Sequence, residues 1–500
     1  MGAPRPVRLS YIVHVVLLPA LLVGAMLAVN GRWYAAPLVE VGDEAAYGLQ
    51  VERAKQFREL VGPYSRFDFN HPGPVASYYY AFTEPLLTPW PSPMGRHHVA
   101  QLLLNAAFLL MALHAIYVLS PRKSDTLLLA AALLFVLARS DLDADYLSKI
   151  WPPYLLIFPA VTLVTTMAGV AMGRLTLILP AALASIYMVH NHVSAATIVA
   201  PFWLVAGTLG VVARSKRPDA RLTSVERMAL GGAFVAVLVA AVPPLVDEWR
   251  HTPGNLSRLW AFFSSRPGAS HGWGESLAFV GAFVARPIWP GAGHPERVLA
   301  VLMLVATLAA MVGPCCRRLL ALQWLGVALL VFGATRVVGP LLDHVMLFTV
   351  AFVALGLFLA LAGLRLGRPL VAWPLVVVAA GMAVGAGAVR EEAAAPQPTE
   401  ALLQAIDPQP GRTYELVWEE EGPHHEQWSM AASLALMMTR RGLAVCTPPA
   451  WWVMFGRDMS ACPPDAERLT LYATALRPEP RRVHAASAGG TTVEWGPELP

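Results

Sequence analysis

The sequence predicts a mainly α fold: a polytopic membrane helix bundle with a small α/β domain at its C-terminal end. Of the 500 residues, 56% are apolar and only 14% are charged, whereas soluble domains have roughly 45–50% and about 25%. A soluble fold cannot shield this much apolar surface from water. The apolar stretches end near residue 390. We therefore expect a transmembrane domain, 1–390, and a separate C-terminal domain, 391–500.

Eleven apolar stretches have lengths typical of membrane-spanning helices, about 17–25 residues. They lie at residues 11–29, 99–119, 124–140, 153–172, 175–191, 194–213, 228–246, 298–314, 319–335, 345–363 and 370–389. The first stretch lacks a small-residue cleavage site before Asn30, so we expect a spanning helix and not a cleaved signal peptide. The segment 276–288 is apolar but too short to cross, and we expect it to lie in the outer interface or to re-enter it.

The basic residues indicate the orientation of these helices. Residues 1–389 carry 28 basic and 18 acidic side chains, a net charge of +10, whereas residues 390–500 carry 9 and 15, a net charge of −6. A cytoplasmic N-terminus places 14 positive charges in alternate, inner loops, from Arg5 and Arg8 to Arg365 and Arg368. Eleven spans then place the acidic tail outside. We expect a bacterial cytoplasmic membrane protein with a periplasmic C-terminal domain.

The tail has the pattern of a small α/β domain. We expect a strand at 414–418, a helix at 426–441 and further strands at 443–446 and 469–476. Cys446 and Cys462 lie in a Pro-rich part of this domain. On the oxidising side of the membrane they are expected to form a disulfide, with two free buried thiols as the alternative.

The first outer loop, 30–98, contains the most informative polar motif. Asp43 and Glu44 follow Gly42, and a helical apolar stripe then begins, which comprises Tyr47, Val51, Ala54, Phe57 and Val61. The pattern predicts an amphipathic helix lying on the membrane with Asp43 at its N-terminus. Acidic residues are favoured at a helix start, which is one interpretation. The other is that two adjacent carboxylates at the membrane surface act as a general base.

Further candidate residues lie later in the first outer loop and in the second outer loop. His71 follows Asn70 in a Pro-rich turn and fits a ligand, a phosphate contact or a turn cap. The second outer loop contains Lys149, which suits an anionic headgroup, and three carboxylates, Asp141, Asp143 and Asp145. Their spacing differs from that of an EF-hand, so both a cation site and a solvated acidic loop stay open.

Two histidines and an arginine lie at the outer ends of spans. His190 and His192 lie at the outer end of the stretch 175–191, where a hydrogen bond to phosphate or sugar competes with metal ligation. Residues two apart do not share a helix face, so metal ligation requires an irregular backbone there. Arg336 suits a phosphate, and the alternative is that its side chain extends to the lipid headgroups.

The layout of these motifs resembles the GT-C superfamily of integral membrane glycosyltransferases. A first span is followed by a large outer loop with the motif Gly42-Asp43-Glu44-Ala45-Ala46-Tyr47 on a juxtamembrane helix. The turn Asn70-His71-Pro72-Gly73-Pro74 is similar to the Pro-rich segment of that family, although better-known members have a Pro-Pro pair there. The chain looks closer to a poorly characterised bacterial subgroup, and the resemblance covers the layout of about residues 1–390.

The resemblance implies a polyprenyl-phosphate sugar as donor, a lipid or glycan as acceptor, and contact with membrane lipids. It implies Asp43 as the general base, with Glu44 as helper or alternative. The residues assigned to the donor phosphate and substrate are His71, Lys149, His190, His192 and Arg336. The three aspartates of the second outer loop would position the acceptor or a divalent cation. Whether a divalent metal is needed is left open, and no other cofactor is assigned. The net charge of +4 argues against a nucleic-acid partner.

Three other functions compete with this one. A transporter or flippase of lipid-linked saccharides would have internal repeats and polar residues in mid-span, and neither is evident. A polysaccharide polymerase or ligase usually has its large outer loop late in the chain, whereas here it follows the first span. A non-catalytic scaffold that presents the tail is the third alternative.

Overall fold

The computed structural model describes residues 9–216, 221–265, 270–310, 314–389, 398–419, 427–475 and 479–498. The inner-loop cations Arg5 and Arg8 lie outside these ranges, as do the ends of the predicted elements at Glu426 and Leu476. The chain divides into two compact units. We call residues 1–31, 99–242 and 261–389 the helical unit, and residues 32–98, 243–260 and 390–500 the mixed unit.

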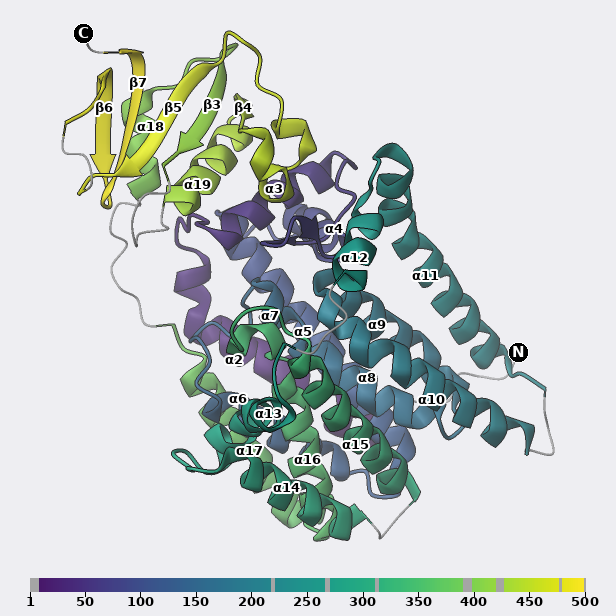
Figure 1. The fold of residues 1–500 in the computed structure, drawn as a ribbon. Helices are drawn as coiled ribbons and strands as arrows, with labels where there is room; N and C mark the ends of the chain where they lie inside the picture. Colours follow the sequence, from purple (N-terminus) through teal and green to yellow (C-terminus); the bar gives the residue numbers. More distant parts are fainter. Residues whose placement is uncertain are drawn as a thin grey trace. The chain divides into compact units, whose positions relative to one another are not determined.

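The helical unit is a bundle in which each predicted apolar stretch contains a helix (Figure 1). It opens with α1 (Leu9–Tyr11), a π-helical turn (Ile12–Val16) and α2 (Leu17–Tyr34). Its further helices, with their bounds, are α5 (Pro93–Leu119), α6 (Asp125–Arg139), α7 (Pro152–Leu155), α8 (Ile157–Val170), α9 (Ile178–Asn191), α10 (Ala196–Ser215), α11 (Ser224–Arg250), α13 (Trp273–Ile288), α14 (Pro295–Ala310), α15 (Pro314–Thr335), α16 (Thr349–Gly363) and α17 (Pro369–Ala386).

Within the described residues, seven helices are long and apolar enough to cross a membrane. They are Leu9–Tyr34, Pro93–Leu119, Pro152–Ala171, Val193–Ser215, Ser224–Arg250, Arg317–Thr335 and Pro369–Ala386. The protein is therefore a multi-pass membrane protein. The remaining predicted spans are shorter helices; α6 and α16 have 15 residues each and are buried along most of their length. A helix that is apolar on all sides suits the centre of a bundle, so the exact number of spans stays a prediction.

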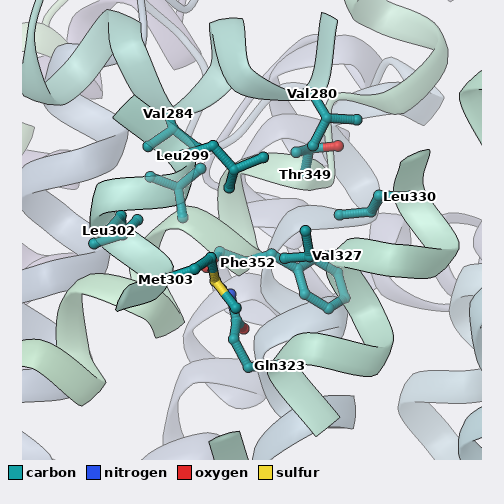
Figure 2. A pocket seen from close by; sticks show the side chains of 11 residues that line it. Val280, Val284, Leu299, Leu302, Met303, Gln323, Val327, Leu330, Thr349 and Phe352 are labelled. Carbon is teal, nitrogen blue, oxygen red and sulfur yellow. The ribbon is translucent and has the colours of Figure 1, made fainter. Parts of the chain in front are cut away.

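The short apolar segment 276–288 forms the helix α13. In Figure 1 α13 is seen nearly end-on, beside α14, α15 and α16, against which it packs. Figure 2 shows Val280 and Val284 of α13 facing Leu299 and Phe352 across a small cavity. Gln323 and Thr349 are the polar residues that line it. The inner face of α13 is thus part of the core of the helical unit.

The mixed unit contains a five-stranded sheet with α18 (Pro398–Ile406) and α19 (Gln427–Arg440) beside it (Figure 1). The strand order is β4-β3-β5-β7-β6. β3 (Thr413–Trp418) is parallel to β4 (Ala444–Cys446) and β5 (Glu467–Ala473), and β7 (Thr491–Glu498) is antiparallel to β5 and β6 (Arg482–Ala488). The predicted α/β domain is confirmed. β6 and β7 had no clear alternating pattern in the sequence, and most β6 residues are at least partly exposed.

The first outer loop folds within this unit. It contains α3 (Asp43–Lys55), a hairpin of β1 (Tyr64–Ser65) and β2 (Phe69–Asn70), and α4 (Val75–Thr83). α3 packs against α19 and α4. Its residues Ala45, Ala46 and Leu49 lie in the same hydrophobic core as the sheet residues Leu416 and Leu471. The compact units therefore group the chain differently from the predicted boundary at residue 390.

α3 also ends earlier than its apolar stripe predicts. It ends at Lys55, whereas the stripe continues to Phe57 and Val61. Phe57 has a left-handed backbone, with φ of 56°, and its side chain is 71% exposed. A residue in this conformation ends a helix. The prediction that the helix follows the apolar stripe beyond Lys55 was wrong for this reason.

The disulfide expected in the tail is present, between Cys446 and Cys462. It closes a loop that contains the short helix α20 (Trp452–Phe455). Carbonyl oxygens of this loop accept hydrogen bonds from the first outer loop: Val453 from the Asn70 amide at 2.8 Å, and Phe455 from the Arg53 guanidinium at 2.7 Å. The loop that the disulfide closes therefore helps to hold the segment from α3 to β2.

Candidate active site

Asp43 is the first residue of α3, and its position depends on the glycine before it. Gly42 has φ of 56° and ψ of −126°, a conformation that a residue with a Cβ rarely adopts. Its N–H points at the Ser429 carbonyl of α19, 3.4 Å away, and a Cβ on it would lie 3.0 Å from the Ser429 hydroxyl. Gly42 thus brings the start of α3 against α19. The N-terminal end of a helix favours negative charge, which suits both Asp43 and Glu44.

A tyrosine from the hairpin contacts Asp43. The Tyr64 hydroxyl donates a short hydrogen bond to the Asp43 Oδ1 atom, and the Tyr47 ring lies 6.4 Å from the Tyr64 ring. Burial and the Asp43 carboxylate raise the pKa of both tyrosines. Both hydroxyls therefore stay protonated at neutral pH. No pattern in the sequence predicts this contact, because Tyr64 is 21 residues from Asp43.

The hairpin that holds Tyr64 is fixed by a buried asparagine. Tyr64 pairs with Asn70 across the hairpin. The Asn255 side chain, which is fully buried, accepts from the Asn70 N–H and donates to the Asn70 carbonyl, both at 2.8 Å. Asp247 accepts the Asn255 backbone N–H at 2.7 Å. The Asn255 side chain thus pairs with the backbone of Asn70 in β2, although the two residues lie far apart in the sequence.

Glu44 lies near a histidine of the mixed unit. A carboxylate oxygen of Glu44 and a ring nitrogen of His98 lie within 4.8 Å of each other. His98 is fully buried, with its ring 4.7 Å from that of Trp33. Carboxylate and imidazole groups are common ligands of metal ions, and whether this protein binds a metal stays a prediction. His98 escaped the sequence analysis because it directly precedes the apolar stretch 99–119.

A line of ion pairs connects α3 to α19 and to the end of α4. Its members are Glu40, Arg440, Glu52, Lys55, Glu84 and His97, and neighbouring side chains in this line lie 2.7 to 2.9 Å apart. Burial alone raises the pKa of the Glu84 carboxyl, but His97 and Lys55 outweigh it and lower this pKa to about 2. Glu84 therefore remains ionised at neutral pH. This line fixes the helix that carries Asp43.

His71 is buried at the end of the hairpin. Its N–H donates to the Pro63 carbonyl at 2.7 Å, and its carbonyl accepts from the Gly62 N–H at 2.9 Å. The His71 ring lies 6.4 Å from the Phe69 ring. These contacts agree with a role in the turn, and contact with a phosphate stays a prediction.

The other candidates belong to the helical unit. Lys149 lies 3.0 Å from Asp143 and 3.3 Å from Asp145, so one cation is shared between two of the three carboxylates. Asp141 is exposed and has a left-handed φ of 54°. The acidic loop and Lys149 thus form one local ion cluster. The sequence predicted separate roles for them.

His192 and Arg336 have local partners in the helical unit. The His192 Nδ1 atom lies 2.6 Å from the Ser194 hydroxyl and accepts the Ser194 N–H, which caps the turn before α10. Burial and, secondly, His344 lower the pKa of His192 to about 4. His192 is therefore neutral at pH 7. The Arg336 guanidinium lies over the Phe332 ring at 5.2 Å, and His190 is buried in α9.

The candidate residues therefore fall in both units. Asp43, Glu44 and His71 belong to the mixed unit, and the others belong to the helical unit. The structure adds Tyr64 beside Asp43 and His98 beside Glu44. The mixed unit contains the adjacent carboxylates, so we take it as the candidate active site.

No protein-family model and no curated protein matches this chain. Among solved structures, ArnT from Cupriavidus metallidurans bound to undecaprenyl phosphate is 12% identical with a TM-score of 0.44, and the match covers 97% of this chain and 100% of ArnT. ArnT in the apo state gives 13% identity, a TM-score of 0.44 and coverages of 97% and 99%.

A third solved structure is similar over a smaller part of its length. The arabinosyltransferase EmbB from Mycobacterium smegmatis is 16% identical with a TM-score of 0.32, and the match covers 77% of this chain and 42% of EmbB. All three TM-scores lie below 0.5 and all three identities below 25%.

Proposed function

We propose that the protein is a membrane glycosyltransferase of the GT-C superfamily. It moves a sugar from a polyprenyl-phosphate donor to an acceptor hydroxyl at the outer face of a bacterial cytoplasmic membrane, and Asp43 is the general base. One observation carries the proposal: Asp43 is a partly exposed carboxylate at the start of α3, beside Glu44 and in contact with Tyr64. The motif around it is the part of the sequence that resembles the superfamily.

The reaction needs two kinds of group. Asp43 takes the proton of the acceptor hydroxyl, and the oxygen attacks the anomeric carbon of the donor sugar from the side opposite the phosphate. The bond between the anomeric carbon and the phosphate oxygen breaks, and the polyprenyl phosphate leaves with the electron pair. A single displacement of this kind inverts the anomeric configuration. A positioned general base contributes typically 10²–10⁴-fold to a rate.

The leaving phosphate needs cations or hydrogen-bond donors. We assign this role to His71, Lys149, His190, His192 and Arg336. Lys149 must then share its charge between the phosphate and its two aspartates, which lie 3.0 and 3.3 Å away. Asp141, Asp143 and Asp145 are assigned to the acceptor or to a divalent cation. The apolar helices place the protein in the lipid bilayer, where a polyprenyl donor is soluble.

The proposal is tested with the full-length protein in lipid nanodiscs. The donors are undecaprenyl-phosphate mannose, glucose and arabinose with radiolabelled sugars, and the readout is label released from the lipid or transferred to added lipid or glycan. Asp43→Asn is expected to lose about 10²–10⁴-fold of the rate, and Glu44→Gln is expected to lose less. Asp465→Asn, an exposed carboxyl of the tail, is the matched control and should retain the full rate.

Two results would overturn the proposal. Full activity of Asp43→Asn would remove Asp43 as the base. Movement of the labelled lipid across the bilayer, with its sugar–phosphate bond intact and no transfer to any acceptor, would favour a flippase.

A further inference from the structure

The Asp43 carboxylate meets the rigid hairpin of the mixed unit through one hydroxyl group. We propose that Tyr64 is a positioning residue for Asp43: its hydroxyl fixes the direction in which the carboxylate faces the acceptor. This inference rests on the proposed function, in which Asp43 is the base. Tyr64 itself takes no part in proton transfer to the acceptor.

The contact between Tyr64 and Asp43 supports this role. The Tyr64 hydroxyl donates to Asp43 Oδ1, and a hydrogen bond to a carboxylate is strong and directional. Burial and the nearby Asp43 charge raise the pKa of Tyr64, so its proton remains available to donate.

The hairpin makes Tyr64 a fixed donor. Tyr64 is paired with Asn70, whose backbone N–H and carbonyl are both bonded to the buried Asn255 side chain. The Asn70 side chain donates to the Val453 carbonyl at 2.8 Å, in the disulfide-closed loop. A donor fixed on a strand costs little entropy when it binds the carboxylate, because its direction is already set.

Other polar groups lie near the start of α3. Glu44 and Tyr47 are on α3 itself, and the His98 ring lies beside Glu44. From α19, Trp428 and Ser429 lie against Gly42. The hydroxyl of Tyr64 is the contact that joins the hairpin to the Asp43 carboxylate.

The first test needs no substrate. Carbodiimide labelling of the full-length protein in nanodiscs at one fixed pH, followed by peptide mass spectrometry, measures how readily the reagent reacts with the Asp43 carboxyl. In Tyr64→Phe the labelling of Asp43 is expected to increase, because the carboxylate has lost the donor on its Oδ1 atom. Tyr78→Phe is the control, because the Tyr78 hydroxyl donates to the backbone carbonyl of Glu59 at 3.0 Å, and it should leave the labelling of Asp43 unchanged.

The second test uses the transferase assay. Tyr64→Phe should lower kcat about tenfold with little change in KM. Adding Tyr64→Phe to Asp43→Asn should cause no further loss. Unchanged labelling of Asp43 together with an unchanged kcat in Tyr64→Phe would overturn the positioning role. Full activity of Asp43→Asn, with increased labelling of Asp43 in Tyr64→Phe, would instead overturn the proposed function alone.

Discussion

Arg440 of α19 binds both carboxylate oxygens of Glu40, at 2.8 and 2.7 Å, and its Nε atom donates to Glu52 of α3 at 2.9 Å. The Glu40 side chain is 2% exposed. Glu40 lies before Asp43 in the chain and Glu52 lies after it, so Arg440 holds the chain on both sides of Asp43. It also connects residues 400 positions apart in the sequence.

Removal of Arg440 should therefore loosen α3. Arg440→Leu leaves the buried Glu40 carboxylate without its cation, and loss of one partner of a buried pair typically costs 3–5 kcal/mol. We expect faster hydrogen exchange in the peptides of α3 and α19. Arg412→Leu is the control, because Arg412 is 63% exposed where it pairs with Glu467, and exposed pairs contribute about 0–1 kcal/mol. Equal exchange in the two variants would contradict the prediction.

Glu84 should make the stability of the mixed unit depend on pH. Its pKa lies at about 2, below its ordinary value of 4.5, chiefly because hydrogen bonds from His97 and Lys55 outweigh the effect of burial. A lowered carboxyl pKa contributes stability that is fully present above pH 4.5 and is lost as the pH falls through about 2. We therefore expect protection of the α3 and α4 peptides to decrease from pH 5 to pH 2.

The Glu84→Gln variant isolates this contribution. It should be less stable than the unmodified protein at pH 6, and the difference should shrink as the pH falls toward 2. Glu400→Gln, at an exposed position of α18, should follow the unmodified protein at every pH. A difference between Glu84→Gln and the unmodified protein that does not change with pH would refute the assignment.

The helices of the apolar stretches could be predicted from the sequence, because they follow from local chemistry. Each apolar stretch contains a helix, since length and apolarity are properties of neighbouring residues. The strands β6 and β7 could not be predicted in the same way. Their pairing depends on β5 and on one another.

The candidate site shows the same division. Asp43 and Glu44 were conspicuous because charged residues are scarce and these two adjoin a helix start. Tyr64, Asn255 and Arg440 contact this region only after the chain folds, and no spacing rule connects them to Asp43. Ser433 of α19, which donates to the Glu40 carbonyl at 2.7 Å, is a further contact of this kind. The sequence pattern therefore did not predict the long-range contacts around the site.

Substitution of Asn255 should be more destabilising than its surface-loop sequence indicates. The triplet Asn255-Leu256-Ser257 matches a glycosylation site, but the Asn255 side chain is fully buried and bonded to Asn70. Asn255→Asp replaces its donor with a charge near Asp247, which accepts the Asn255 N–H. An unsatisfied buried group typically costs 1–3 kcal/mol, and more if charged.

We expect Asn255→Asp to expose β2 to hydrogen exchange and to reduce the transferase rate about tenfold or more. Leu256→Ala is the matched control from the same triplet, because Leu256 is only partly buried, and it should have a smaller effect. Expression in a glycosylating host should leave Asn255 unmodified in folded protein. Glycan on Asn255, found by mass spectrometry of the folded fraction, would show that its side chain is accessible.

Gly363 and Gly381 are both glycines of apolar helices, and the structure predicts opposite effects of alanine at the two positions. At Gly363, the last residue of α16, a Cβ would lie 2.4 Å from the Cα atom of Ala309 in α14. Backbone atoms cannot move aside as a flexible side chain does, so α14 and α16 must separate. Overpacking of this kind typically costs 1–3 kcal/mol.

At Gly381, in α17, no atom lies within 4 Å of the added Cβ. Alanine there should gain up to about 1 kcal/mol in helix propensity. Thermal unfolding in one detergent, followed by intrinsic fluorescence, should therefore give a lower midpoint for Gly363→Ala and an equal or higher midpoint for Gly381→Ala. Because the substitution is chemically identical, helix propensity alone predicts the same sign at both positions. A higher midpoint for both variants would mean that α14 and α16 do not approach as closely at Gly363 as the structure shows.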